Sequence, residues 1–93
     1  MFSWDTQKAI RNFEKHGVSF EEAATIFADE EGLDWEDREH SHSERRFKRL
    51  GSSITGRILI VVYTMREHGN GKETVRIISA RIASRKERKI YLS

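Results

Sequence analysis

The pattern of apolar and polar residues divides the chain into a helical beginning and a strand-rich second half. Residues 5–16 place their apolar side chains on one face of a helix with 3.6 residues per turn. Asp5 stands where an N-cap residue is needed. We therefore expect a first helix over 5–16, with three core-facing residues, Ala9, Ile10 and Phe13.

A glycine and a serine mark the next boundary. Gly17 can adopt the left-handed conformation that ends a helix near His16. Ser19 and Glu22 have the spacing of a capping box, in which each side chain accepts the other residue's backbone N–H. These signals predict a second helix over roughly 20–28, joined to the first by a turn of about two residues.

Four segments resemble β-strands. Residues 33–37 suit a short edge strand, and the alternation in ERRFKRL (44–50) would turn three polar residues to one face, Glu44, Arg46 and Lys48. The run RILIVVYTM (57–65) is apolar throughout, which is typical of a central strand covered on both faces. After the turn-rich EHGNGK, TVRIISAR (74–81) is its predicted antiparallel partner.

The end of the chain completes the predicted fold. Ser84 and Glu87 form a second capping box, which predicts a short C-terminal helix. Two N-terminal helices, a three- to four-stranded, mostly antiparallel sheet and this helix make an α+β fold with the helices mainly on one face. No repeat or linker interrupts the chain, so residues 1–93 are expected to form a single domain.

Composition and charge narrow the class of protein. The chain has no cysteine, which excludes disulfides and thiolate sites, and no apolar run approaches the ~20 residues of a membrane helix. The N-terminus lacks the apolar core of a signal peptide, so we expect a cytoplasmic protein without a membrane partner. The net charge of +2 combines an acidic stretch over 21–44 with a basic remainder. That remainder favours nucleic acid as a partner, and a solvated charge-rich surface is an equally good interpretation.

Charged residues on the predicted strands form the first candidate site. Glu44 and Arg46 would share a face, and Arg76 lies on another strand of the sheet. Alternation sends Arg81 to the face opposite Arg76 unless a bend at the strand end brings it round. Arginines beside a carboxylate suit a phosphodiester site, where they stabilise a phosphorane while a carboxylate or imidazole transfers protons. A ladder of cross-strand salt bridges is the competing interpretation.

The histidines offer further candidates. His16, at the end of the first helix, could act in acid–base chemistry or complement the helix dipole. A polar stripe on the same helix contains Lys8, Asn12 and either Lys15 or His16. His40 and His42 lie in an acidic loop, but their spacing matches no specific metal motif, so no metal site is expected. Three aromatic residues are expected in the core or at its edge rather than as base-stacking platforms: Trp4, Trp35 and Tyr63.

Several motifs resemble a known family. They are FSWDTQKAIRNFEKHGVSFEEAATIFADE, DREHSHSERRF, Gly51, GRILIVVYT and RIISARIASRKERKIY. Together they resemble the BrnT family, the toxin halves of bacterial type II toxin–antitoxin pairs. The resemblance covers almost the whole chain. Its most specific parts are W-D-x-x-K-A, K-H-G-V-S-F-E-E-A and R-I-I-S-A-R-x-A-S-x-x-E-R-x-x-Y.

The resemblance implies a fold like that of RelE-type toxins and a small ribonuclease that blocks translation. It also implies neutralisation by a cognate BrnA antitoxin with a ribbon-helix-helix DNA-binding part. If the antitoxin dimerises, an assembly of two toxins and two antitoxins is expected. Contact with operator DNA would then come through the antitoxin.

For such an enzyme we predict that the substrate's own 2′-hydroxyl attacks the adjacent phosphate, a route that needs no metal or other cofactor. The residues predicted for the chemistry are Glu44, Arg46, Arg76, Arg81 and His16, with Glu44 or His16 transferring protons. The residues predicted to bind RNA are Lys8, Lys15, Arg85, Arg88 and Tyr91. Arg45 stands where a second acidic residue would be more typical of the family. The alternatives are a non-catalytic nucleic-acid-binding module and a protein-interaction subunit.

Overall fold

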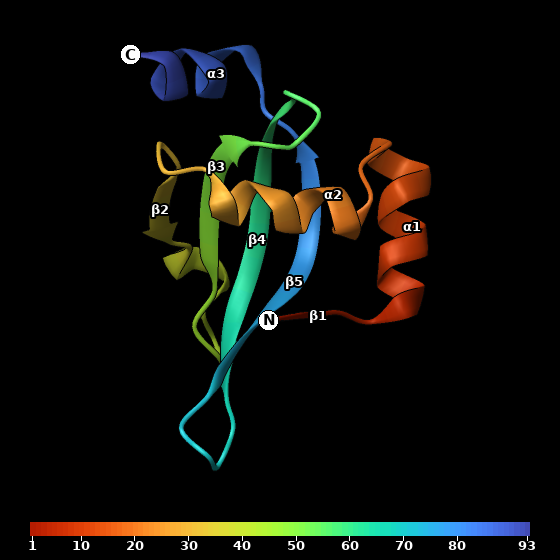
Figure 1. Ribbon diagram of the computed structural model, residues 1–93, viewed down its shortest axis with the longest axis vertical. Helices are drawn as coiled ribbons and strands as arrows, with labels where there is room; N and C mark the ends of the chain where they lie inside the picture. Colours follow the sequence, from red (N-terminus) through yellow and green to blue (C-terminus); the bar gives the residue numbers. More distant parts are fainter.

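The structure, a computed structural model, describes all 93 residues and has an α+β fold (Figure 1). Its five-stranded sheet has the order β1-β5-β4-β3-β2. The strands are β1 (Phe2–Ser3), β2 (Leu33–Glu36), β3 (Phe47–Ser52), β4 (Ile58–Glu67) and β5 (Glu73–Ile82). The helices are α1 (Thr6–His16), α2 (Phe20–Thr25) and α3 (Arg85–Leu92), with 3₁₀ turns at Ile26–Ala28 and Arg38–His40. None of the helices is long and apolar enough to cross a membrane.

The sheet has one strand more than the sequence predicts, and it is mostly antiparallel as expected, with one parallel pairing. The extra strand, β1, pairs in parallel with β5, placing Phe2 opposite Val75 and Ser3 opposite Arg76. A strand of two residues is too short to show an alternating pattern, which is why the sequence does not reveal it. The central position predicted for β4 is confirmed.

The helices cover different parts of the sheet (Figure 1). Helix α2 crosses one face, α1 stands beside β5, and α3 lies beyond the ends of the strands, so only α2 follows the prediction of helices on a face. The main core lies between this face and the α1–α2 region and contains Val18, Phe20, Ala23, Ile26, Leu59, Val61, Ile77 and Ala80. A smaller cluster of Leu50, Ile60 and Ala83 is covered by Tyr91 of α3.

Helix α1 begins and ends as predicted, but it packs through a polar residue. Ile10 and Phe13 are 51% and 56% exposed, whereas Asn12 is buried. The Asn12 amide donates to the carbonyls of Val18 (3.1 Å) and Ala80 (2.8 Å), and its oxygen accepts the N–H of Ala80 (3.1 Å). Because β1 is too short to reach Ala80, the side chain of Asn12 takes the place of a neighbouring strand there.

A β-bulge interrupts the pairing of β4 with β5. Val62 pairs with Ser79, whereas the next residue, Tyr63, pairs with Ile77. Ile78 is therefore an extra residue in β5, and the alternation of side chains changes phase at this point.

This change of phase decides which arginines lie together. Ile77 and Ala80 both belong to the core under α2 although they are three residues apart. Arg76 and Arg81 consequently both turn to the other face of the sheet. The sequence-based prediction that Arg81 lies on the face opposite Arg76 is therefore wrong, because strict alternation does not allow for the bulge at Ile78.

Candidate functional site

The sheet has an open face, turned away from α2, and a helix-covered face. The register places these strand residues on the open face: Leu33, Trp35, Lys48, Leu50, Ile60, Val62, Thr64, Arg66, Thr74, Arg76, Ser79 and Arg81. All of its charged residues are basic. The helix-covered face has the strand carboxylates Asp34, Glu36, Glu67 and Glu73 and a single basic residue, Arg49. The pleat therefore separates the strand charges by sign.

Arg49 has a structural reason to be the exception. Its guanidinium donates to the carbonyls of Ile26 (3.2 Å) and Asp29 (2.6 Å) and pairs with Asp34. These contacts attach the turn after α2 to the sheet. The basic residues of the open face make no comparable set of bonds to backbone carbonyls.

Two of the predicted arginines lie in one row across the open face. Thr64 pairs with Arg76, and extending the antiparallel register one residue before β3 places Arg46 on the other side of Thr64. The Thr64 hydroxyl donates to the carbonyl of Arg45 (2.8 Å), which holds this segment against β4. Arg46 and Arg76 therefore flank one small buried side chain.

A hollow brings the end of α1 against the open face. It is lined by Lys15, His16, Lys48, Ile60, Val62, Ser79, Ala80 and Arg81. Three of these are predicted site residues, Lys15, His16 and Arg81. Sequence reasoning did not select Lys48 and Ser79, although the alternation of Lys48 with Arg46 is a signal that could have included it.

Arg81 is held at this hollow by α3. Its guanidinium donates two hydrogen bonds to the carboxylate of Glu87, at 2.7 and 2.9 Å. Glu87 also completes the predicted capping box with Ser84. The pairing with Arg81 lowers the pKa of Glu87 to about 2 and raises that of Arg81. The Arg81 side chain is still 40% exposed, so it is fixed in orientation and accessible to a ligand.

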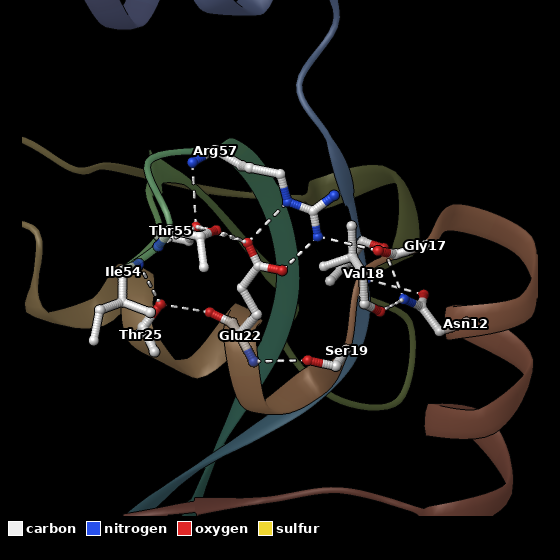
Figure 2. Close-up of polar contacts among 11 residues, drawn as sticks. Asn12, Gly17, Val18, Ser19, Glu22, Thr25, Ile54, Thr55 and Arg57 are labelled. Atoms are coloured by element: carbon white, nitrogen blue, oxygen red, sulfur yellow. Dashed lines mark hydrogen bonds and ion pairs between the residues drawn. The ribbon is translucent and has the colours of Figure 1, made fainter.

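A second arginine–glutamate pair fixes the corner between α1 and α2 (Figure 2). The Glu22 carboxylate accepts hydrogen bonds from the hydroxyls of Ser53 and Thr55 (both 2.7 Å) and from both Nε (2.9 Å) and Nη2 of Arg57. The same guanidinium donates to the carbonyl of Gly17 (3.0 Å). The bond with Arg57 is the main cause that lowers the pKa of Glu22 to about 2.

This network explains why the predicted capping box at α2 is only half formed. The Ser19 hydroxyl accepts the N–H of Glu22 (3.0 Å), but the Glu22 carboxylate turns toward Arg57. Charge-assisted bonds to a guanidinium are stronger than a bond to a backbone N–H of a serine. Together with Asn12, these bonds anchor the chain on both sides of His16.

Glu44 lies apart from the hollow. It lies in the segment before β3, which begins at Phe47, and its contact is with Arg66 of the open face. Its carboxylate is 3.6 Å from the guanidinium of Arg66. Lys8 also lies away from the hollow, at the start of α1. The hydrogen bond from its backbone N–H is the main cause that lowers the pKa of Asp5, and the charges of Lys8 and Arg76 lower it further.

The predicted RNA-binding residues of α3 have different environments. Arg85 and Arg88 are exposed. Tyr91 instead donates its hydroxyl to the carboxylate of Asp29 at 2.5 Å, and this bond raises its pKa to about 12. Tyr91 thus connects α3 to the turn after α2.

The three aromatic residues expected at the core also differ. Tyr63 is buried and Trp4 packs partly buried against the core, as predicted. Trp35 is 42% exposed on the open face.

The acidic loop that contains His40 and His42 forms no metal cluster. His40 Nδ1 is 2.9 Å from the Asp37 carboxylate, and no group of three or more His, Cys, Asp or Glu side chains is arranged to hold a metal ion.

Comparison with known proteins adds evidence on the family. Residues 4–87 match the family model of the ribonuclease toxin BrnT of type II toxin–antitoxin systems. The 1.1 Å crystal structure of the Brucella abortus ribonuclease toxin BrnT has the same fold, with a TM-score of 0.68, 23% sequence identity and coverage of 91% of this chain and 99% of that chain. A search of curated protein sequences finds no match. Since the family model matches nearly the whole chain, the protein belongs to the BrnT family of ribonuclease toxins of type II toxin–antitoxin systems.

Proposed function

We propose that the open face binds RNA and that the hollow at the end of α1 cleaves it without a metal ion. The observation that carries this proposal is the charge separation in the sheet. Lys48, Arg66, Arg76 and Arg81 share a face that has no strand carboxylate. Such a surface attracts the phosphates of a single strand, and binding gains free energy from the release of counterions.

The proposed reaction uses the 2′-hydroxyl of the substrate as nucleophile. A base takes the hydroxyl proton, O2′ bonds to phosphorus, and the bond from phosphorus to O5′ breaks. The products are a 2′,3′-cyclic phosphate and a 5′-hydroxyl, whose oxygen takes its proton from solvent. An arginine that faces the phosphorane would stabilise its added charge, and we assign this role to Arg81, which lines the hollow. Arg46 and Arg76, which flank Thr64 on the same face outside the hollow, would bind neighbouring phosphates of the strand.

We assign the proton transfer to His16 rather than Glu44. His16 lines the hollow with Lys48 and Arg81, whereas Glu44 pairs with Arg66 outside it. Histidine is also the side chain that most often serves as a general base. The exposed residues Lys8, Lys15, Arg85 and Arg88 would extend the contact with the RNA backbone. The Tyr91 hydroxyl is bonded to Asp29, so we leave it out of the chemistry.

The partners follow from the family rather than from the geometry. A ribonuclease toxin of a type II toxin–antitoxin system has an antitoxin as its protein partner and RNA as its substrate. We propose more specifically a BrnA-like ribbon-helix-helix antitoxin, a complex of two toxins with two antitoxins, and operator DNA contacted through the antitoxin. The proposed effect of the free toxin, as a single RelE-like domain in the cytoplasm, is to block translation.

The test is to incubate the purified protein with a single-stranded RNA in EDTA, beside the same sequence built from 2′-deoxyriboses. The proposal expects cleavage of the RNA alone, with cyclic or 3′-phosphate ends, because only RNA has the nucleophile. Cleavage of both strands, or cleavage that needs a divalent ion, would contradict the mechanism. An RNA that is bound but stays intact would favour the non-catalytic alternative.

A further inference from the structure

We propose that Trp35 is a base-stacking residue of the RNA-binding surface, one that holds a nucleobase next to the phosphate contacts. This inference rests on the function proposed above and adds a specific subsite to it. It starts from an exposed tryptophan whose position the fold defines closely. Trp35 lies on β2, the edge strand of the sheet, and is 42% exposed.

The register shows which face the ring occupies. Asp34, the preceding residue, accepts hydrogen bonds from Tyr63 and Arg49 on the helix-covered face. Trp35 therefore points to the open face, directly opposite Lys48 of β3. Paired side chains at such positions are about 5 Å apart at Cβ.

The row through Trp35 leads to the hollow. Trp35 pairs with Lys48, Lys48 with Val62, and Val62 with Ser79. Lys48, Val62 and Ser79 all line the hollow that holds His16 and Arg81. Since neighbouring strands are about 4.8 Å apart, Trp35 is about three strand spacings from Ser79. A base stacked on Trp35 would thus belong to a nucleotide near the one that is cleaved.

Charge favours RNA over a protein as the occupant of this position. The strand residues of the open face have several positive charges and no carboxylate, so a polyanion is preferred there. A large flat ring beside a lysine is the combination that single-strand-binding proteins use, with the ring stacking on a base and the cation meeting its phosphate. Contact of the exposed tryptophan ring with water is unfavourable in the free protein, and stacking on a base would remove part of the ring surface from water.

The experiment measures binding of an RNA whose 2′-hydroxyls are methylated, so that the strand lacks the nucleophile. Trp35→Ala is expected to weaken its binding roughly 5- to 100-fold, the range for loss of one stacked base. Trp35→Phe keeps a stacking ring and is expected to weaken it only about threefold. The dependence on salt should be unchanged in both variants, whereas Lys48→Ala should reduce the salt slope by about 0.7 because it removes one phosphate contact.

Leu33→Ala is the matched control. Leu33 lies on the same strand and face as Trp35 and is also 42% exposed, but it has no ring. Its removal should leave RNA affinity within about twofold of the wild type. Equal losses in Leu33→Ala and Trp35→Ala would overturn the inference, because the effect would then come from β2 as a whole.

A scan of abasic sites along the RNA tests the stacking directly. One missing base should weaken binding to the wild type and leave binding to Trp35→Ala unchanged, which is the coupling expected of a touching pair. If no abasic position behaves in this way, or if Trp35→Ala binds as tightly as the wild type, the proposed role of Trp35 is overturned. Binding of the strand by the wild type would still support the RNA-binding face in that case. Failure of the wild type itself to bind the methylated strand would overturn both. If Trp35→Ala binds the antitoxin more weakly but binds RNA as tightly as the wild type, the ring contacts the antitoxin rather than RNA, and the inference is overturned.

Discussion

The two faces of one sheet differ in what they bury and in the sign of the charges they carry. The helix-covered face packs its apolar residues under α2 and has all of the strand carboxylates. The open face leaves basic residues and Trp35 accessible. The same pleated backbone thus provides stability on one side and a binding surface on the other, because successive side chains point in opposite directions.

The two arginine–glutamate pairs show the same difference in detail. Arg57 and Glu22 share their hydrogen bonds with Ser53, Thr55 and Gly17, so this pair ties three segments together (Figure 2). Arg81 and Glu87 make a similar two-bond contact, but the guanidinium borders a hollow with other cations. The chemistry of the pair is therefore not enough to tell a structural role from a functional one, and the neighbours decide.

The largest expected effect is on the helix-covered face. Phe20 is fully buried in the main core, so Phe20→Ala should lower the free energy of unfolding by about 3–5 kcal/mol. Urea denaturation followed by circular dichroism measures the loss. Leu33→Ala on the open face should change it by less than about 1 kcal/mol. Comparable losses in the two variants would remove the division between a stabilising and a binding face.

Arg81→Ala tests the open face. The proposed role at the phosphorane predicts a fall in cleavage rate of roughly 100- to 1,000-fold, as for the loss of one donor to a developing charge. The accompanying loss of stability should be small, since the pair with Glu87 is partly exposed. Arg11→Ala removes the same charge from an exposed position on α1 and should keep the rate within about twofold. A rate for Arg81→Ala close to that of Arg11→Ala would contradict the assignment.

Glu22→Gln tests the structural pair. Loss of the charge leaves Arg57 without its partner, and we expect the unfolding free energy to fall by about 2 kcal/mol. Glu21→Gln is the control, because the neighbouring carboxylate is exposed and unpaired. The difference between the two urea midpoints measures the contribution of the network. Equal midpoints would show that the network adds nothing to stability.

A smaller effect should appear in acid. The pKa values of Glu22 and Glu87 are both lowered to about 2 from the ordinary value of 4.5. The folded protein therefore binds these protons more weakly than the unfolded chain, so the stabilisation is complete above about pH 4.5 and is lost as the pH falls toward 2. Thermal melts between pH 5 and pH 2.5 should show a decline that is shallower in Glu22→Gln. An equally steep decline would assign the acid sensitivity to other carboxylates.

Local signals in the sequence predicted the helices well. The Asp5 cap, the Gly17 stop and the Ser84–Glu87 capping box all occur as expected, because each depends on contacts within a few residues. Predictions about faces were weaker. Ile10 and Phe13 of α1 are exposed and Asn12 is buried, since the helix meets the open backbone edge of β5 rather than an apolar surface.

The candidate site shows the same limit. Lys15, His16 and Arg81, three of the predicted site residues, line one hollow, whereas Glu44 pairs with Arg66 outside it. The bulge was found only in the structure, where Ile77 and Ala80, three residues apart, both belong to the core, which does not fit a regular strand. Alternation with Arg46 could have included Lys48, whereas Trp35 could be selected only once the register of β2 and β3 was known.

By itself the sequence determined the three helices and their N-terminal caps, four of the five strands, the acidic and basic halves of the chain and the family. These properties depend on residues that are close together in the sequence, or on motifs that can be recognised in the sequence itself. The sequence missed β1, and it extended the second helix to residue 28, where the structure ends α2 at Thr25 and continues with a 3₁₀ turn. Tertiary structure decided the rest: the bulge that brings Arg76 and Arg81 to one face, the anchoring of α1 by Asn12, and the separation of charge between the faces. Each of these depends on pairing between residues far apart in the sequence, and a shift of one residue in that pairing would reverse the face that a side chain occupies.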